Sequence, residues 1–369
     1  MFQTSRITLR EIAEKTGVTR MAVSLALRGK AGVSKATRKH VLKAAKKLGF
    51  KPDPELAKLL SHIRTRDASA VKSSLALLTS GATPEAWKQY VTERKYVEGV
   101  FSRAKEYGYR VEEFWIDQPG MSDARLSNII WHRGIEGILI APLQERLAKG
   151  PRRGIDLNFN LFTAVEISET IQRPNLDRSL HDQYSAMIKV LDELSCLNYK
   201  TVGFVIEEAL ELRVNFKWSA AFLLHRHRMG SARVPPPLIM ASPSQPAFDK
   251  WFDHYRPDVI VSVDGFGLRF LKKRGMAIPG EVGYASLDID GDAGESIPIS
   301  GIDQNSLRVG AAAVDLLVGA IHRHHRGLPA HPVRIEIEGI WTAGKSTVRQ
   351  RCQRPNHRLN SKCFPSGSR

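Results

Sequence analysis

The chain has few cysteines, no long hydrophobic run and no apolar leader. Its three cysteines, Cys196, Cys352 and Cys363, are odd in number and far apart, which argues against a disulfide framework and fits a reducing compartment. No apolar run approaches the roughly 20 residues that a transmembrane helix needs. The first residues, MFQTSRITLREIAEK, are charged almost from the start and lack a secretory core. We therefore expect a cytoplasmic protein with no membrane partner.

Acidic residues are scarce at the two ends of the chain. Residues 1–66 contain 16 Lys and Arg against 4 Asp and Glu, and residues 350–369 contain 5 basic residues and no acid. These two segments therefore carry the whole formal net charge of +17, and residues 67–349 are neutral. A positive excess this large over 66 residues is more than solubility requires, so we expect a polyanion as the partner.

The basic N-terminal block has the start and stop signals of three short helices. In RITLREIAEKTGVTRMAVSLALRG, Thr8 and Glu11 have the spacing of a capping box, and Gly17 marks a turn. Thr19 and Ser34 are placed to cap a second and a third helix. The apolar residues that recur at helical spacing, and that we expect to form a shared core, are Leu9, Ile12, Ala13, Ala22, Val23, Ala26, Leu27, Val41, Ala44, Ala45 and Leu48. Two such helices joined by a short turn predict a helix-turn-helix unit.

The run TLREIAEKTGVTRMAVSLALRG…VSKATRKHVLKAAKKLGFKPDP resembles the DNA-binding headpiece of LacI/GalR-type transcription regulators. The resemblance implies that the second helix lies in the major groove, with Arg20 and Met21 facing bases and Leu25 one turn further on. Arg20 could bind guanine or only phosphate, and the operator sequence does not carry over. Hydroxyls and helix N-termini would bind phosphates. The DNA-binding residues implied in this way are Thr8, Leu9, Thr19, Arg20, Met21, Ser24, Leu25, Ser34, Thr37 and Leu59.

The segment KPDPELAKLLSHIR predicts a further short helix, which starts with Asp53 as its cap and Pro54 in its first turn. In the resembling family this is a hinge helix that orders on DNA and pushes a leucine between bases in the minor groove. Leu59 matches that position best. Alternatively, the leucines of this segment pack onto the rest of the protein.

Residues 74–347 alternate between apolar strands and amphipathic helices. The expected strands are 73–80, 111–117, 135–142, 199–207, 257–265 and 282–290, and the expected helices are 96–110, 123–134, 217–230 and 267–275. Repeated strand–helix–strand units predict parallel sheets with helices on both faces, and ligands in such sheets sit at the carboxyl ends of strands. The fold class is therefore a helical headpiece joined to an α/β domain.

The segments RLSNIIWHRGIEGILIAP and IPGEVGYASLD resemble the LacI/GalR effector domain, which is similar to periplasmic sugar-binding proteins. The resemblance implies two Rossmann-like lobes that the chain crosses three times, with a small-molecule effector, of a carbohydrate kind, between them. Asp264 and Asp288 follow strands and would face the effector. Near ELRVNFKW an effector-binding arginine is expected, but the register is loose, so Arg213 and Asn215 compete for that role. Each of these residues could instead be an ordinary surface or strand-end group.

These patterns divide the chain into a headpiece (1–51), a hinge and linker (52–73), a two-lobed domain (74–347) and a basic disordered tail (348–369). The first lobe is expected to comprise about 74–178 and 306–332, and the second about 179–305 and 333–347. The tail could add weak, salt-sensitive affinity for DNA.

One motif competes with this interpretation. GIWTAGKST at 339–347 contains the G-x-x-x-x-G-K-[ST] pattern of a phosphate-binding P-loop. The pattern needs a long helix directly after it and further strands, yet Pro355 follows soon and the sequence ends at 369. We expect instead the closing edge of the second lobe. The histidine runs at 225–228 and 322–326 have no recognised metal-ligand spacing, and no nucleophile motif is present.

Together with the basic headpiece, the resemblance to LacI/GalR regulators implies a homodimeric, nucleoid-associated transcription regulator, a repressor, that is not an enzyme and needs no cofactor. Its predicted partners are a near-palindromic double-stranded operator and a small-molecule effector. Three alternatives stay open: an effector-independent architectural DNA-binding protein, a P-loop nucleotide-binding protein, and a periplasmic-type binding protein. The last explains the neutral body but not the basic headpiece.

Overall fold

The computed structural model describes residues 9–27, 32–48, 73–143, 154–171, 173–230, 234–292 and 294–350. The chain divides into two compact units, Met1–Val71 and Lys72–Arg369. Each unit is described by itself below. No helix in the described ranges is both long enough and apolar enough to cross a bilayer.

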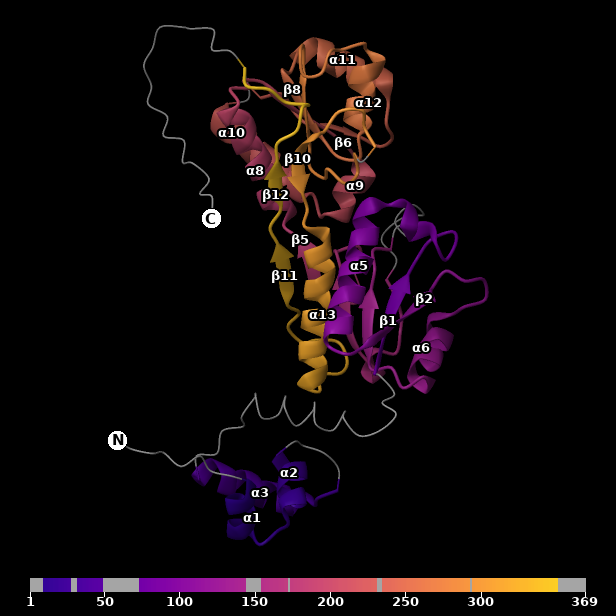
Figure 1. Cartoon of the computed structure of the whole chain (residues 1–369), viewed down its shortest axis with the longest axis vertical. Helices are drawn as coiled ribbons and strands as arrows, with labels where there is room; N and C mark the ends of the chain where they lie inside the picture. Colours follow the sequence, from indigo (N-terminus) through magenta and orange to yellow (C-terminus); the bar gives the residue numbers. More distant parts are fainter. Residues whose placement is uncertain are drawn as a thin grey trace, which may run out of the picture. The chain divides into compact units, whose positions relative to one another are not determined.

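The N-terminal unit contains three helices, α1 (Leu9–Thr16), α2 (Arg20–Leu27) and α3 (Lys35–Lys47), which pack against one another (Figure 1). The predicted shared core is confirmed at its centre, where Ile12, Val23 and Val41 are fully buried. Ser34 caps α3 as expected, since its hydroxyl accepts a hydrogen bond from the Thr37 amide at 3.0 Å. Thr19 accepts the Ala22 amide in the same way at 3.2 Å, at the start of α2. Local capping and a small apolar core therefore position α2, the predicted recognition helix.

The second unit is built on two six-stranded sheets. The first has the order β11-β5-β4-β3-β1-β2, and all of its strand pairs are parallel. Its strands are β1 (Ser74–Thr79), β2 (Arg110–Trp115), β3 (Gly137–Ile140), β4 (Thr163–Ile167), β5 (Asp177–His181) and β11 (Arg334–Ile337). The helices that belong to it are η1 (Ala86–Gln89), α5 (Val91–Glu106), α6 (Asp123–His132), η2 (Phe159–Leu161) and α13 (Ser306–His322).

Two apolar clusters cover the faces of the first sheet. Helices α5 and α13 pack together and cover one face, where Val100 and Val314 are fully buried. Helix α6 contributes Leu126 and Ile130 to the core on the other face. Parallel strands buried on both sides read as continuous apolar runs, which is why β1 and β3 were evident from the sequence.

The second sheet has the order β12-β10-β9-β8-β6-β7, in which only the β12–β10 pair is antiparallel. Its strands are β6 (Val202–Glu207), β7 (Leu238–Met240), β8 (Val259–Ser262), β9 (Gly283–Ser286), β10 (Ser300–Asp303) and β12 (Ile340–Thr342). Its helices are α8 (Gln183–Cys196), α9 (Glu208–Arg213), α10 (Lys217–Met229), α11 (Gln245–Tyr255) and α12 (Phe266–Lys273). One large aromatic-rich core, including Phe204, Phe222 and Phe248, joins these elements.

The chain passes three times between the two sheets, after β5, after β10 and after β11 (Figure 1). The crossings contact one another: the His181 Nδ1–H donates to the Ile337 carbonyl oxygen at 2.9 Å, and Asn305 donates to the Glu338 carbonyl oxygen at 3.3 Å. Burial lowers the pKa of His181 to about 4, so its ring is neutral at physiological pH. The two-lobed, three-crossing architecture matches the expectation.

The crossing points differ from those predicted. Residues 179–181 and 334–337 had been assigned to the second lobe, but they form part of β5 and the whole of β11 in the first sheet. Arg334 to Ile337 pair in parallel register with Arg178 to His181. The segment RIEIEGIWT reads as one continuous strand, and its division between two sheets at Glu338–Gly339 follows from pairing partners that the sequence does not reveal.

Ser346 and Lys345, which belong to the P-loop pattern, make structural hydrogen bonds in this fold. The Ser346 side chain is fully buried; its hydroxyl donates to the Tyr284 carbonyl oxygen at 2.7 Å and accepts the Ser300 amide at 2.8 Å. The Lys345 amide donates to the Pro298 carbonyl oxygen at 2.7 Å, and residues 343–350 are not helical. A phosphate site needs free amides at a helix start, so this segment is a structural edge of the second sheet.

Candidate functional site

The predicted DNA-binding residues lie mostly on α2 and at the start of α3. Met21 is 74 % exposed in the first turn of α2, an unusual position for a large apolar side chain with no role in the core. Leu25, one turn on, is half-buried beside Gly32, so it offers less surface to a partner than Met21 does. Thr19 and Ser34 are exposed caps, and Thr37 is half-buried.

Other predicted DNA contacts lie outside the described part of the structure. Thr8 and Leu59 belong to segments that are not described, and so does the predicted hinge helix. The backbones of Leu9, Arg20 and Ser24 are helical, but their side chains are outside the description. The exposed lysines that α3 adds to this unit are Lys35, Lys39, Lys43, Lys46 and Lys47.

In the second unit, Asp264 lies two residues after β8 and has a left-handed backbone with φ of 55°. This conformation is strained for a residue other than glycine and is often kept at ligand sites. Asp264 is an exposed residue, but the protein around its carboxyl group withdraws part of it from water. This desolvation raises the pKa of Asp264, and the positive charges of Arg213 and Arg269 partly oppose the shift. Asp264 is thus an accessible acid at a strand end, as predicted.

Asp288 lies two residues after β9 and is only 5 % exposed. Its Oδ2 accepts a hydrogen bond from the Thr92 hydroxyl at 2.6 Å, and its Oδ1 accepts the Asp290 amide at 3.0 Å. Burial raises the pKa of Asp288 to about 7; the Thr92 hydrogen bond opposes this, and the charges of Asp264 and Asp290 add to it. The charge of Asp288 therefore changes near neutral pH.

Arg213 ends α9 and acts electrostatically on groups of both lobes. Its guanidinium lowers the pKa of Asp264 in the second lobe and of Glu93 and Tyr96 on α5 in the first. Arg213 therefore acts on Asp264 and on the facing helix α5, and Asp264 in turn acts on Asp288; that these residues bind an effector stays a prediction.

Asn215 has a different setting. Its backbone is left-handed, with φ of 53°, and its Nδ2 donates to Glu169 Oε2 in the first lobe at 2.7 Å. Lys217 also bridges to Glu169, at 2.8 Å. Of the two competing candidates, Arg213 belongs to the electrostatic group of Asp264, whereas Asn215 joins the lobes through Glu169.

The sequence missed the first turn of α5, which carries Thr92, Glu93 and Lys95. The expected helix began at Tyr96, whereas α5 begins at Val91. Glu93 is 3 % exposed, and burial raises its pKa to about 8, although Arg213 opposes the shift. An acidic residue in the first turn, here Glu93, is a start signal that could have revealed this turn.

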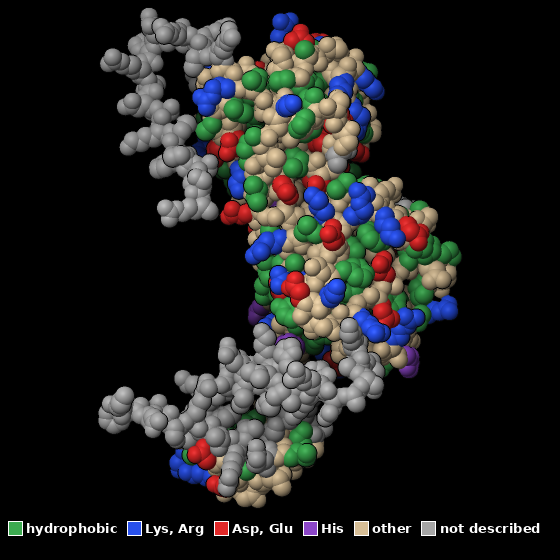
Figure 2. All heavy atoms as spheres, in the orientation of Figure 1, with side chains coloured by type: hydrophobic (Ala, Val, Ile, Leu, Met, Phe, Trp, Pro, Cys, Tyr) green, Lys and Arg blue, Asp and Glu red, His purple; other side chains and the backbone are tan. Residues whose placement is uncertain are grey.

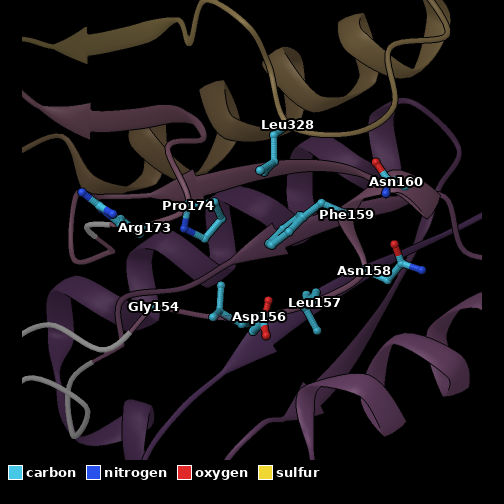
Figure 3. A pocket seen from close by; sticks show the side chains of 10 residues that line it. Gly154, Asp156, Leu157, Asn158, Phe159, Asn160, Arg173, Pro174 and Leu328 are labelled. Atoms are coloured by element: carbon cyan, nitrogen blue, oxygen red, sulfur yellow. The ribbon is translucent and has the colours of Figure 1, made fainter.

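A cavity among the described residues lies elsewhere, in the first lobe (Figure 3). It has a volume of about 560 Å³ and is lined by the loop 154–160, by Arg173 and Pro174 and by Leu328. None of the predicted effector-binding residues lines it. Among the described residues, no group of three or more His, Cys, Asp or Glu side chains could hold a metal ion.

Both signs of charge are mixed over the visible face of the second unit (Figure 2). This agrees with the neutral formal charge of the body and contrasts with the basic N-terminal block. No single-sign surface on that face would bind a polyanion, so DNA contacts are expected from the headpiece.

Comparisons with known proteins concern the N-terminal helices and the overall fold separately. Residues 8–53 match the family model for bacterial regulatory proteins of the lacI family. No curated protein sequence matches the chain significantly.

Solved structures match most or almost all of the chain. A transcriptional regulator CelR in complex with cellobiose is 19 % identical, with a TM-score of 0.55, covering 92 % of this chain and 100 % of its own. The lac repressor dimer bound to operator and the anti-inducer ONPF is 15 % identical, with a TM-score of 0.53, covering 93 % and 100 %. A lacI-family regulator from Bifidobacterium animalis subsp. lactis is 16 % identical, with a TM-score of 0.55, covering 74 % and 97 %. At these identities the likeness shows a common fold.

Proposed function

We propose that this chain, with its lacI-family N-terminal domain, is a homodimeric transcription regulator that binds a specific operator and responds to a small-molecule effector. The observation that carries the proposal is the lacI-family match over residues 8–53, joined in one chain to a two-lobed α/β body. A regulator needs a DNA reader and a second site that changes shape with a ligand. The N-terminal unit is proposed to bind DNA, and the two-lobed unit is proposed to bind the ligand.

On the DNA side, α2 is proposed to enter the major groove. The exposed Met21 would make apolar contact with a thymine methyl group, and Arg20, next to it, would bind a guanine edge or a phosphate. The start of α3, where Ser34 and Thr37 lie, would bind the phosphate backbone. Repression and a cytoplasmic location are part of the same proposal.

On the effector side, the proposed site is the group of Arg213, Asp264 and Asp288, with Glu93 on the facing helix. Carboxylates and a guanidinium that converge from two lobes can hydrogen-bond a polyhydroxylated ligand from both sides. One of the structurally similar proteins is in complex with the sugar cellobiose, which supports a sugar-like effector. Asn215 is proposed as a secondary contact.

Selection of bound duplexes from a random pool tests the DNA half. The full-length protein is expected to enrich one near-palindromic site, with two half-sites about one helical turn apart. The variants Arg20→Ala and Met21→Ala should lose enrichment at particular base positions, while Lys43→Ala on the exposed face of α3 serves as a control for charge alone. Equal recovery of all sequences would favour the second candidate, an architectural DNA-binding protein, which the basic headpiece alone would also explain.

A further inference from the structure

Helix α5 and the segment after β9 come from different lobes and are joined by two short polar contacts. The Thr92 hydroxyl donates to Asp288 Oδ2 at 2.6 Å, and the Lys95 ammonium pairs with Asp290 Oδ1 at 2.6 Å. The partners are almost 200 residues apart in the chain, separated by 196 and 195 positions. Both contacts lie within one turn of α5, so they close the same edge of the lobe junction.

The acidic partners of these contacts are nearly inaccessible to water. Asp288 is 5 % exposed and Asp290 is 8 % exposed, whereas Lys95 remains partly exposed. Charged groups withdrawn from water are costly unless they are paired or neutralised. If the lobes separated here, both aspartates would regain water. Separation of the lobes at this edge would break both contacts, which in this closed arrangement hold buried acid against an adjacent helix.

A second set of polar contacts also joins the two lobes. Glu169, 2 % exposed in the first lobe, accepts from Asn215 at 2.7 Å and pairs with Lys217 at 2.8 Å. The three chain crossings form the permanent connection between the lobes. In the described part of the chain, no strand runs from α5 to the segment after β9. The lobes can therefore separate at these two contacts while both sheets stay intact.

Asp288 is surrounded by ionisable groups from several elements. Those that act on it or on its immediate partners are Glu93, Lys95 and Tyr96 of α5, Arg213 of α9, Asp264 after β8, Arg269 of α12, Asp290 and Asp292 of its own segment, and Asp303 of β10. Acids outnumber bases in this set. A proton on Asp288 relieves repulsion from Asp264 and Asp290.

We propose that Thr92, Lys95, Asp288 and Asp290 form a latch between the two lobes, and that a proton on Asp288 strengthens it. The latch does not depend on DNA binding or on the identity of an effector. Because Asp288 also belongs to the proposed effector site, an effector would act on the same closed–open equilibrium as the proton does.

The direction of the pH effect follows from the raised pKa. In the closed arrangement burial, above all, raises the pKa of Asp288 from an ordinary 3.8 to about 7, and a lobe that opens returns the group to water. Closure therefore takes up a proton and is favoured as pH falls through 7. With these two pKa values the closed-to-open ratio should be about tenfold larger at pH 6 than at pH 8. Glu93, whose pKa burial raises to about 8, adds to the change in the same direction.

Distance measurement between spin labels on the two lobes tests the latch directly. Labels would replace Lys105 on α5 and Lys250 on α11, both exposed, in a full-length chain whose three cysteines are changed to serine. Dilution with excess unlabelled chain restricts the reading to pairs within one chain. The short-distance, closed population should grow from pH 8 to pH 6.

Three variants separate the latch from general effects. Lys95→Met removes the cation and should enlarge the open population at both pH values. Asp288→Asn keeps a neutral hydrogen-bonding group beside Thr92, so it should stay closed at pH 8 and lose about tenfold of the pH response. Lys272→Met breaks an ion pair with Glu295 inside the second lobe and should match the parent. Unchanged distances in both latch variants, or an equal change in Lys272→Met, would overturn the proposal.

Discussion

Glu93 is a buried carboxyl group whose charge is costly to the folded protein. Its raised pKa of about 8, caused chiefly by burial, means that the folded state binds a proton more tightly than the unfolded state does. Its contribution to stability is therefore present at low pH and lost as pH rises through 8. We expect Glu93→Gln to stabilise the protein already at pH 6, and by roughly 2–3 kcal/mol more at pH 9 than at pH 6, because the parent loses this stability as pH rises from 4.5 to 8.

Denaturant unfolding of the parent and the variant across that pH range measures the difference. The matched control is Glu98→Gln on the same helix. Glu98 is exposed, so this substitution should leave the stability of the protein unchanged at every pH. Parallel stability curves for Glu93→Gln and the parent would contradict this interpretation of Glu93.

Glu166 and Arg178 form a second kind of buried acid, one that is fully paired. Arg178 Nε contacts Glu166 Oε2 at 2.6 Å, and its Nη2 donates to the Ile171 carbonyl oxygen at 2.6 Å. Arg178→Met would leave Glu166 buried without its partner, so we expect a loss of about 3–5 kcal/mol in the free energy of unfolding. The double variant Arg178→Met with Glu166→Leu should recover part of that loss; a double variant as unstable as the sum of both single changes would contradict it.

At the scale of single residues, the sequence predicted which residues follow the strands, and their role in binding an effector stays a prediction. Asp264 and Asp288 follow apolar runs, and parallel strands deliver their ends to one edge, so position alone predicted their neighbourhood. Glu93 was missed because the apolar stripe of its helix becomes clear only from Tyr96 onward. Asn215 was given a role that its contact with Glu169 only partly fits, because the sequence does not tell which lobe a loop residue faces.

At the scale of elements, helices α5 and α13 approach each other closely at two glycines. A Cβ added to Gly310 would lie 2.0 Å from the Tyr96 carbonyl oxygen, and one added to Gly99 would lie 2.0 Å from the Leu307 carbonyl oxygen. Gly310→Ala should force the helices apart and destabilise the protein by about 1–3 kcal/mol. It should also disturb the first turn of α5, which lies next to this crossing.

Gly319→Ala in the same helix is the control for that change. There an added Cβ would meet only the flexible end of Arg323, at 3.3 Å. Alanine favours a helix over glycine by roughly 1 kcal/mol, so this variant should be neutral or more stable. Thermal unfolding that ranks the two variants equally would show that the helix crossing does not limit stability.

The predicted hinge helix, which lies outside the described residues, can be tested through Leu59. If Leu59 wedges between bases, Leu59→Ala should weaken binding to the selected operator more than binding to a scrambled duplex. Titrations of both duplexes at one salt concentration measure the two losses. An equal loss on both would indicate that Leu59 packs onto protein instead.

At the scale of the whole molecule, the sequence predicted the two-lobed architecture better than the residues at which the chain passes from one lobe to the other. Continuous apolar strands alternating with amphipathic helices predicted two parallel lobes, and the asymmetry of charge separated the headpiece from the body. The assignment of β11 to the second lobe was wrong, because a nine-residue run such as 334–342 carries no mark of which sheet each half joins. The apparent P-loop shows the same limit, since GKS there closes an edge of a sheet.

The central claim is that the state of the lobe junction controls how the headpiece binds DNA. The most direct measurement is the affinity of full-length variants for the selected duplex at fixed pH and salt. Lys95→Met and Asp288→Asn should shift that affinity in opposite directions, by about 5–150-fold between them, while Lys272→Met and all affinities for a scrambled duplex stay unchanged. Equal affinities for the selected duplex across the parent and both latch variants would contradict the account.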